Sequence, residues 1–376
     1  MALRRGSLAD VDLAQPMASA DPPRAGSVDA DFWRNRRVMI TGHTGFKGAW
    51  LALWLQDLGA RVTGFSAKTR AQPSLYELAR VGEGMESIEG DVCDADAVAS
   101  AVAAAAPEVV IHMAAQSLVR RSFAEPRETF EINVMGTVNV LDAVRRSGEG
   151  VRVLVNVTSD KCYENHEWEW GYREVEPMGG HDPYSGSKGC AELVTAAYRR
   201  SFFLDGHGTR IASARAGNVI GGGDWGEDRL VPDIMRAALA SARVRIRNPN
   251  SVRPWQHVLN PLSGYLSLAQ ALWDSPELAA GWNFGPAEQD ARPVGWIVER
   301  IGELWPDEIR WEVDDGPHPH EARYLKLDSS RARTRLGWRS PVALDATLQS
   351  IVEWYRALRE GEDMRAVTMA QIKGLQ

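Results

Sequence analysis

Three glycines, Gly42, Gly45 and Gly48, constrain the fold of this sequence more than any other feature. They follow a β-rich stretch at 37 to 41 and open an apolar helical pattern at 45 to 58, so they are expected at a turn between a strand and a helix. Glycine there allows a tight turn and a close approach of the backbone to a pyrophosphate, which the helix N-terminus stabilises. The pattern therefore predicts a dinucleotide-binding turn, and the alternative is an ordinary strand-to-helix connection.

Strand and helix patterns go on alternating after this turn, which is typical of a parallel sheet covered on both faces. We therefore predict an α/β fold with a doubly wound parallel Rossmann sheet and a smaller C-terminal substrate-binding lobe. The rhythm changes after residue 218 to loops rich in Gly, Pro and Trp. Further strands are expected at 61–65, 87–89, 108–113 and 152–158, and helices at 126–146, 183–203, 229–239 and 344–359.

The same patterns suggest limits for the domains. Residues 1–30 lack periodicity and an apolar core, which is typical of a disordered tail. We expect a dinucleotide-binding Rossmann domain over 31–220, to which the chain returns around 255–285, and a lobe that holds mainly substrate over 221–376.

Bulk properties exclude several classes of protein. A formal net charge of −7 gives no reason to expect a nucleic-acid binder, and any bound phosphate must be met by local cations. No apolar run approaches the roughly 20 residues that cross a bilayer. Cys93, Cys162 and Cys190 are too few and too irregularly spaced for a disulfide framework or a zinc site, which fits a reducing cytoplasm and no metal.

Other residues at the expected strand ends also suit a dinucleotide. Asp91 follows the third strand, where its carboxylate either accepts hydrogen bonds from an adenine amino group or caps the next helix. Small residues after the next strand leave room for the ligand, whereas His112 receives no chemical role. Besides the glycines, the candidate cofactor contacts are Phe46, Lys47, Asp91, Val92, Ala114, Ala115 and Gln116.

The choice between NAD and NADP stays open from the residues alone. NAD sites usually carry Asp or Glu about 20 residues after the glycines, to bind the ribose hydroxyls. This region reads FSAKTR instead, with Lys68 and Arg70, so local chemistry also permits a 2′-phosphate.

A candidate catalytic pair lies on the helix expected at 183–203. Tyr184 and Lys188 are four residues apart and share one helix face, after Asp182 as N-cap and Pro183 as the first helical residue. A lysine ammonium near the phenol favours the phenolate, which can take a proton from a sugar hydroxyl. The alternative is an exposed aromatic side chain beside a charge.

Ser159, Asp160 and Lys161 end the strand expected at 152–158, at the edge where open α/β sheets bind ligands. Ser159 can hydrogen-bond the oxygen that Tyr184 deprotonates, and the next two residues add an acid and a potential base. The alternative is a solvated turn with a surface ion pair.

Five segments together resemble the CDP-glucose 4,6-dehydratase family of extended short-chain dehydrogenases/reductases. The similarity covers nearly everything from 32 to 355, and Lys161 and the GGGDW run separate it from dTDP-glucose and GDP-mannose dehydratases. The segments are TGHTGFKGAWL (Thr41 to Leu51), NVTSDKCYEN (Asn156 to Asn165), PYSGSKGCAELV (Pro183 to Val194), ARAGNVIGGGDW (Ala214 to Trp225) and RPWQHVL (Arg253 to Leu259).

This resemblance implies an NAD-dependent lyase of deoxysugar and O-antigen biosynthesis. It would dehydrate CDP-D-glucose to CDP-4-dehydro-6-deoxy-D-glucose through oxidation at C4, loss of water across C5 and C6, and return of the hydride to C6. The implied oxidation triad is Ser159, Tyr184 and Lys188, with Tyr184 and Lys188 also touching the cofactor, and Asp160 and Lys161 serve elimination. Asn218 and Arg253 would meet the sugar diphosphate, with Arg229 as a further candidate.

Alternatives remain. Lys161 is the C5 base only if its surroundings lower its pKa from the usual value of about 10.4. A 4,6-dehydratase or epimerase of another nucleotide-activated sugar uses the same triad, although Asp160 and Lys161 exceed the needs of epimerisation. A binding protein without catalysis has no need for Tyr184 and Lys188. By resemblance, the helices at 126–146 and 183–203 predict a homodimer.

Overall fold

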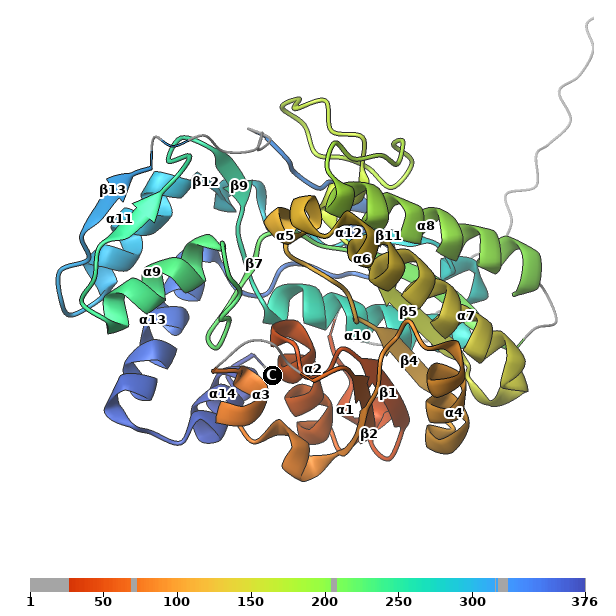
Figure 1. Ribbon diagram of the computed structural model, residues 1–376. Coiled ribbons are helices and arrows are strands. Elements are labelled where there is room, and N and C mark those ends of the chain that lie inside the picture. Colours follow the sequence, from red (N-terminus) through yellow and green to blue (C-terminus); the bar gives the residue numbers. More distant parts are fainter. Residues whose placement is uncertain (1–26, 69–72, 204–207, 315, 317–323, 376) are drawn as a thin grey trace, which may run out of the picture.

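The computed structural model describes residues 27–68, 73–203, 208–314, 316 and 324–375, and its central layer is a seven-stranded parallel sheet (Figure 1). The strand order is β11-β6-β5-β4-β1-β2-β3, with the crossover between β1 and β4 that is typical of a doubly wound fold. This confirms the predicted fold class. The strands are β1 (Arg37–Thr41), β2 (Arg61–Ser66), β3 (Glu86–Glu89), β4 (Val109–His112), β5 (Val153–Val157), β6 (Arg210–Arg215) and β11 (Gly281–Asn283).

Alternate residues of the central strands enter two separate cores, because successive side chains of a strand point to opposite faces. In β1, Val38 and Ile40 join the larger core, and Met39 joins the smaller one. Burial of both faces explains why these strands read as continuous apolar runs.

Helices cover both faces of the sheet (Figure 1). The helices α4 and α7 pack together over the smaller core with α8 beside them, while α2 and α10 pack on the opposite face within the larger core. These helices are α2 (Phe46–Asp57), α4 (Ala95–Ala105), α7 (Gly136–Arg146), α8 (Pro183–Phe202) and α10 (Leu259–Asp274), and shorter ones are α1 (Ala30–Trp33), α3 (Leu75–Leu78), η1 (Val81–Gly84), η3 (Gly148–Gly150), η4 (Asp160–Cys162) and η5 (Pro276–Leu278).

The helix expected at 126–146 is interrupted. It consists of α6 (Pro126–Phe130), a π-turn η2 (Glu131–Met135) and α7, and a short helix α5 (Val119–Ala124) precedes it. Asn133 in the π-turn exchanges hydrogen bonds with the backbone of Gln116 and donates to Ser187. The extra residue in this turn thus lets one side chain tie the loop after β4 to α8, a contact that periodicity does not reveal.

A smaller lobe lies beside the carboxyl ends of the strands (Figure 1). After β6 the chain enters this lobe, comes back to the central sheet with α10 and β11, and then leaves it again. The lobe contains β7 (Val219–Ile220), α9 (Leu230–Leu239), β8 (Val244–Ile246), β9 (Val252–Pro254), β10 (Gln256–His257), η6 (Glu288–Asp290), β12 (Ala291–Pro293), α11 (Val294–Leu304), β13 (Trp311–Val313) and α13 (Leu344–Glu360). Two further helices return to the sheet domain: α12 (Ser330–Arg335) contacts β11, and α14 (Met364–Lys373) contacts α2 as well as α13.

Residues 1–26 of the predicted tail lie outside the described residues, and α1 begins at Ala30, with Asp29 as its N-cap. Among the helices that the structure describes, none is long and apolar enough to cross a membrane.

Candidate active site

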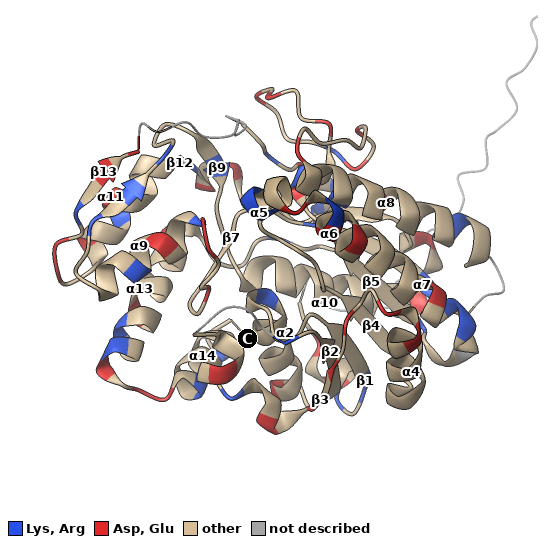
Figure 2. Ribbon diagram, in the orientation of Figure 1, with Lys and Arg blue, Asp and Glu red and all other residues tan. Residues whose placement is uncertain are grey.

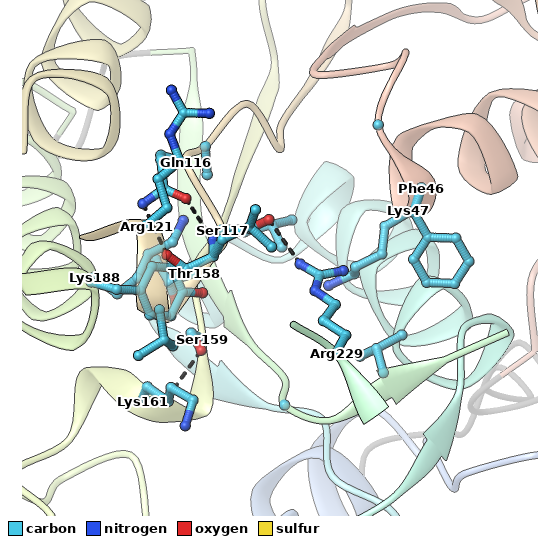
Figure 3. Close-up of a pocket in the computed structure, with 18 of the residues that line it drawn as sticks. Phe46, Lys47, Gln116, Ser117, Arg121, Thr158, Ser159, Lys161, Lys188 and Arg229 are labelled. Carbon is cyan, nitrogen blue, oxygen red and sulfur yellow. Dashed lines mark hydrogen bonds between the residues drawn. The ribbon is translucent and has the colours of Figure 1, made fainter. Parts of the chain in front are cut away.

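A pocket of about 1000 Å³ opens where the carboxyl ends of the strands face the smaller lobe. Figure 3 shows Ser159 and Lys188 on one wall and Lys47 and Arg229 on the other. Every residue that we named as a catalytic, NAD-binding or substrate-binding candidate lines this pocket. The structure therefore brings the whole set together, while the role of each residue stays a prediction.

The glycine turn forms the part of the pocket above β1. Gly42 has φ +76°, and a Cβ atom there would lie 2.8 Å from the backbone of Ala114. A Cβ atom on Gly48 would lie 2.2 Å from the carbonyl oxygen of Gly42. The helix α2 then begins after Gly45 without a side-chain cap, so its first amides face the pocket mouth unsatisfied by any capping group. This cradle fits a pyrophosphate.

Asp91 and Gln116 lie at the next two strand ends. Asp91 Oδ1 accepts a hydrogen bond from the backbone of Cys93 at 2.9 Å, whereas Asp94 is the residue that caps α4. The alternative interpretation of Asp91 as the helix cap is therefore wrong. The Gln116 side chain bonds the backbone of Leu118 and the hydroxyl of Thr129, so it shapes the loop after β4.

The region that bears on NAD or NADP is only partly described. Ser66 at the end of β2 hydrogen-bonds Thr44 at 2.8 Å, and Lys68 lines the pocket. Arg70, the other predicted contact of a 2′-phosphate, lies outside the described residues.

Ser159 and Asp160 form a tight pair after β5. The Ser159 hydroxyl donates to Asp160 Oδ1 at 3.0 Å and accepts from the backbone of Lys161 at 3.2 Å. Asp160 is only 1% exposed, and its Oδ2 has no hydrogen-bond partner. A solvated turn with a surface ion pair is therefore the wrong interpretation. A buried carboxylate oxygen that lacks a hydrogen-bond partner is uncommon in native proteins, and a catalytic role is one of its explanations.

Tyr184 and Lys188 lie on the first turns of α8, where Asp182 caps the helix and Pro183 opens it. Ser122 on α5 accepts a hydrogen bond from the Tyr184 backbone at 3.1 Å. Burial raises the pKa of Tyr184 to about 12, against the lowering effect of a hydrogen bond to Ser159. Burial lowers the pKa of Lys188 to about 8.

Burial acts against one expectation about this pair. We expected Lys188 to favour the phenolate of Tyr184; burial of the phenol raises its pKa, whereas the Ser159 hydrogen bond and the charge of Arg229 lower it. The sequence places the two groups on one helix face, but it does not report how dry that face becomes.

Lys47 is a buried cation of the pocket with a strongly lowered pKa. Its Nζ donates to the Tyr265 hydroxyl at 3.0 Å. Burial, together with the charges of Lys188 and Arg229, lowers its pKa to about 7, and Asp160 opposes the shift. We named Lys47 as a cofactor contact, but nothing in its sequence surroundings indicated that burial would lower its pKa.

On the substrate side, Arg229 donates to Asp224 at 3.2 Å and to the Ser117 hydroxyl at 2.8 Å. Arg253 is only 8% exposed, so its side chain is largely buried where it lines the pocket and is not an ordinary surface arginine. Asn218 adopts φ +47° at the start of β7. Although the chain carries a net negative charge, Figure 2 shows basic segments at α2, α5 and β9, all of which contribute to the pocket.

Other pocket residues and their supports escaped the sequence analysis. Ser117 and Arg121 line the pocket, and Ser122 holds the start of α8. Behind the catalytic strand end, Glu192 accepts hydrogen bonds from Thr158 and forms a buried ion pair with Arg215 at 2.7 Å. The last three residues lie far apart in the sequence and come together only in the folded chain. No motif of fixed spacing links them, so the sequence contained little indication of their roles.

Comparison with known proteins gives a family match. The family model described as GDP-mannose 4,6 dehydratase matches residues 39–351. The chain is 52% identical over 350 residues to a Salmonella typhimurium protein named CDP-glucose 4,6-dehydratase, covering 92% of this chain and 97% of that protein. It is 28% identical to a Mycolicibacterium smegmatis UDP-glucose 4-epimerase, covering 85% of this chain and 98% of that protein.

Solved structures share the fold. A dTDP-glucose 4,6-dehydratase from Streptomyces venezuelae, solved with NAD and TYD bound, superposes with a TM-score of 0.72 at 24% identity. A UDP-glucose 4-epimerase from Stenotrophomonas maltophila, solved with NAD and formylated UDP-arabinopyranose, gives a TM-score of 0.75 at 22% identity. The matches cover 88% and 87% of this chain, and 99% of each neighbour.

Proposed function

Because the chain belongs to the family described as GDP-mannose 4,6 dehydratase, we propose that it dehydrates CDP-D-glucose to CDP-4-dehydro-6-deoxy-D-glucose. The relative from Salmonella carries the name of this substrate, which supports the choice of CDP-glucose. The observation that carries dehydration, rather than oxidation alone, is the buried Asp160 carboxylate with its free Oδ2 beside Ser159.

The proposed cofactor is NAD. The cradle formed by Gly42 and Gly48 and the uncapped start of α2 fit its pyrophosphate, and the solved neighbours from Streptomyces and Stenotrophomonas hold NAD. Lys47, Asp91 and Gln116 line the surrounding pocket. When bound, NAD supplies the hydride acceptor for C4 and, once reduced, the hydride donor for C6.

Tyr184 is the group that we assign to the first proton transfer. Its phenolate takes the proton of the C4 hydroxyl as C4 becomes a ketone, while Ser159 hydrogen-bonds the same oxygen and, like the charge of Arg229, favours the phenolate. The Lys188 ammonium stabilises the negative charge that develops there, since its pKa of about 8 leaves it mostly charged at neutral pH.

Asp160 and Lys161 carry the elimination. The new ketone acidifies the proton on C5. Lys161, which acts as a base only in its neutral form, removes this proton, and the electron pair forms the C5–C6 double bond. Asp160 gives a proton to the hydroxyl group that leaves C6, so one water forms as the C6–O bond breaks. Both residues line the same stretch of the pocket.

The diphosphate of the substrate requires cations on the other side of the cavity. Arg253 is the first candidate and Arg229 the second, because a planar guanidinium binds phosphate oxygens with two parallel hydrogen bonds. Asn218 also lines the pocket. We assign these three residues to the sugar diphosphate.

Isotope transfer tests this function. With deuterium at C4 of CDP-glucose, we expect deuterium at C6 of the product, because hydride leaves and returns within one binding event. In deuterated water, solvent deuterium should enter at C5, and no net cofactor should be consumed. Product analysis by NMR and mass spectrometry reads all three results.

Asp160→Asn extends the test. The variant should oxidise C4 and then stall with reduced cofactor bound, visible at 340 nm, because the amide cannot protonate the leaving hydroxyl. Deuterium retained at C4, or release by the wild type of a 4-keto sugar that keeps its 6-hydroxyl, contradicts dehydration. Faster turnover of another sugar in a panel of CDP-, dTDP-, UDP- and GDP-sugars contradicts the choice of substrate.

We also propose a homodimer and a cytoplasmic location. Large apolar side chains are exposed on adjoining helices, namely Phe130 on α6, Met135 on η2, and Leu193 and Phe202 on α8. Such a surface favours association with a second copy. The three free cysteines support a reducing compartment.

A further inference from the structure

The Asp160 carboxylate lies directly against the backbone of Gly217, in the loop between β6 and β7. A Cβ atom built on Gly217 would lie 1.7 Å from Asp160 Oδ2, 1.9 Å from its Cγ and 2.4 Å from its Oδ1. All three distances are far below van der Waals contact. The carboxylate therefore occupies the space that any side chain at residue 217 would need.

Gly217 is not required here by its backbone conformation. It is absent from the described residues with positive φ, whereas the next residue, Asn218, adopts φ +47° without being glycine. An alanine could take the backbone conformation of residue 217, so the reason for glycine at this place is room for Asp160.

Neither partner can retreat easily. Asp160 is held by the Ser159 hydroxyl and is buried. Gln256 holds the backbone at Gly217. Its side-chain Nε2 donates hydrogen bonds to the carbonyl oxygen of Gly217 at 3.1 Å and to that of Phe284 at 3.0 Å. The Gln256 backbone donates to Asn218 at 3.2 Å. A side chain at residue 217 would therefore displace the carboxylate rather than the loop.

We propose that Gly217 is a positioning residue for the elimination step, because its missing side chain creates the place from which Asp160 protonates the hydroxyl leaving C6. The proposal rests on the proposed function. It separates two groups of residues, since the three atoms nearest the Gly217 Cβ position all belong to Asp160 and none to Tyr184 or Lys188, which serve oxidation.

Gly217→Ala tests this role. Oxidation of C4, followed in a single turnover as reduced cofactor at 340 nm, should stay within about threefold of the wild type. Dehydration should fall about 100-fold, the usual effect of misplacing a catalytic group by about 1 Å. Reduced cofactor should therefore accumulate in the variant as it does in Asp160→Asn. A general structural defect would instead slow both steps together.

Gly302→Ala is the matched control, because a Cβ atom there would meet only Ile309 Cβ at 4.0 Å. It should dehydrate at the wild-type rate. Dehydration by Gly217→Ala within threefold of the wild type overturns the inference. Failure of the wild type itself to move deuterium from C4 to C6 refutes the proposed function instead.

A double variant decides the case if Gly217→Ala folds poorly. Asp160→Ala removes the carboxylate that alanine at 217 would strike, so Gly217→Ala/Asp160→Ala should regain the unfolding temperature of Asp160→Ala alone and its C4 oxidation. Such a coupling is expected only for side chains in contact. Equal losses from Gly217→Ala in both backgrounds overturn the inference.

Discussion

At the scale of single residues, the pocket concentrates cations whose charge is costly to keep. Lys47 hydrogen-bonds Tyr265 inside the cavity, and burial brings its pKa to about 7. Lys188 has a pKa of about 8 for the same reason. In a site that binds an anionic ligand, the unfavourable desolvation of such cations is offset when the ligand supplies the opposite charge.

Lys47→Met should therefore stabilise the cofactor-free protein at low and neutral pH. The folded pKa of about 7 lies below the unfolded value of 10.5, so the folded state binds fewer protons between these values and its stability rises with pH there. Below pH 7 both states are charged and the penalty is complete. Below pH 7 the free energy of unfolding of the variant should exceed that of the wild type by on the order of 2 kcal/mol. This difference should vanish above about pH 10.5.

Thermal unfolding of both proteins at pH 6 and at pH 10 measures this effect. Lys373→Met replaces a lysine whose side chain is 63% exposed, and it should change the midpoint little at either pH. An increase in the unfolding midpoint of Lys47→Met that is the same at both pH values would contradict a lowered pKa of Lys47 as the cause.

At the scale of elements, one buried ion pair fastens α8 to the sheet. Arg215 in β6 and Glu192 in α8 are both nearly inaccessible, and Thr158 and Ser213 donate to the same carboxylate. Burial alone would raise the pKa of Glu192, but the charge and hydrogen bonds of Arg215 keep it lowered. The pair thus sets the distance between the helix that carries Tyr184 and the strand ends.

Removing one partner should cost more than removing both. Arg215→Met leaves a buried carboxylate without its cation, and it should lower the free energy of unfolding by about 3 to 5 kcal/mol. Arg215→Met/Glu192→Met should recover a substantial part of this loss, because no unpaired charge remains. Urea unfolding measures both, and a double variant less stable than Arg215→Met would contradict the interpretation.

At the scale of the whole molecule, α6, α7 and α8 lie side by side on one flank, away from the smaller lobe, while α5 lies at the end of this group next to that lobe (Figure 1). Leu193 on α8 is 59% exposed on this flank. Our domain limits at 31–220 and 221–376 remain a prediction, although β11 at 281–283 belongs to the central sheet.

Leu193→Asp should convert the proposed homodimer into a monomer, because a carboxylate would be buried against apolar side chains of the second copy. Sedimentation velocity should show half the wild-type mass. Val175→Asp places the same charge at a more exposed apolar residue in the loop before α8 and should leave the dimer intact. An unchanged mass for Leu193→Asp would exclude this flank as the interface.

The sequence by itself determined the features that depend on short spacings. The glycine turn, the cap and first residues of α8, and Ser159 and Asp160 after β5 were all predictable, because backbone geometry and side-chain periodicity act over a few residues. From these, the fold class and the gathering of the strand ends followed, since parallel strands bring their carboxyl ends to one edge.

Only the tertiary structure decided how these groups affect one another. The raised pKa of Tyr184, the lowered pKa of Lys47, and the contact between Gly217 and Asp160 each depend on segments separated by tens to hundreds of residues. Burial and close approach depend on how whole elements pack, and the spacing of residues along the chain carries no record of either.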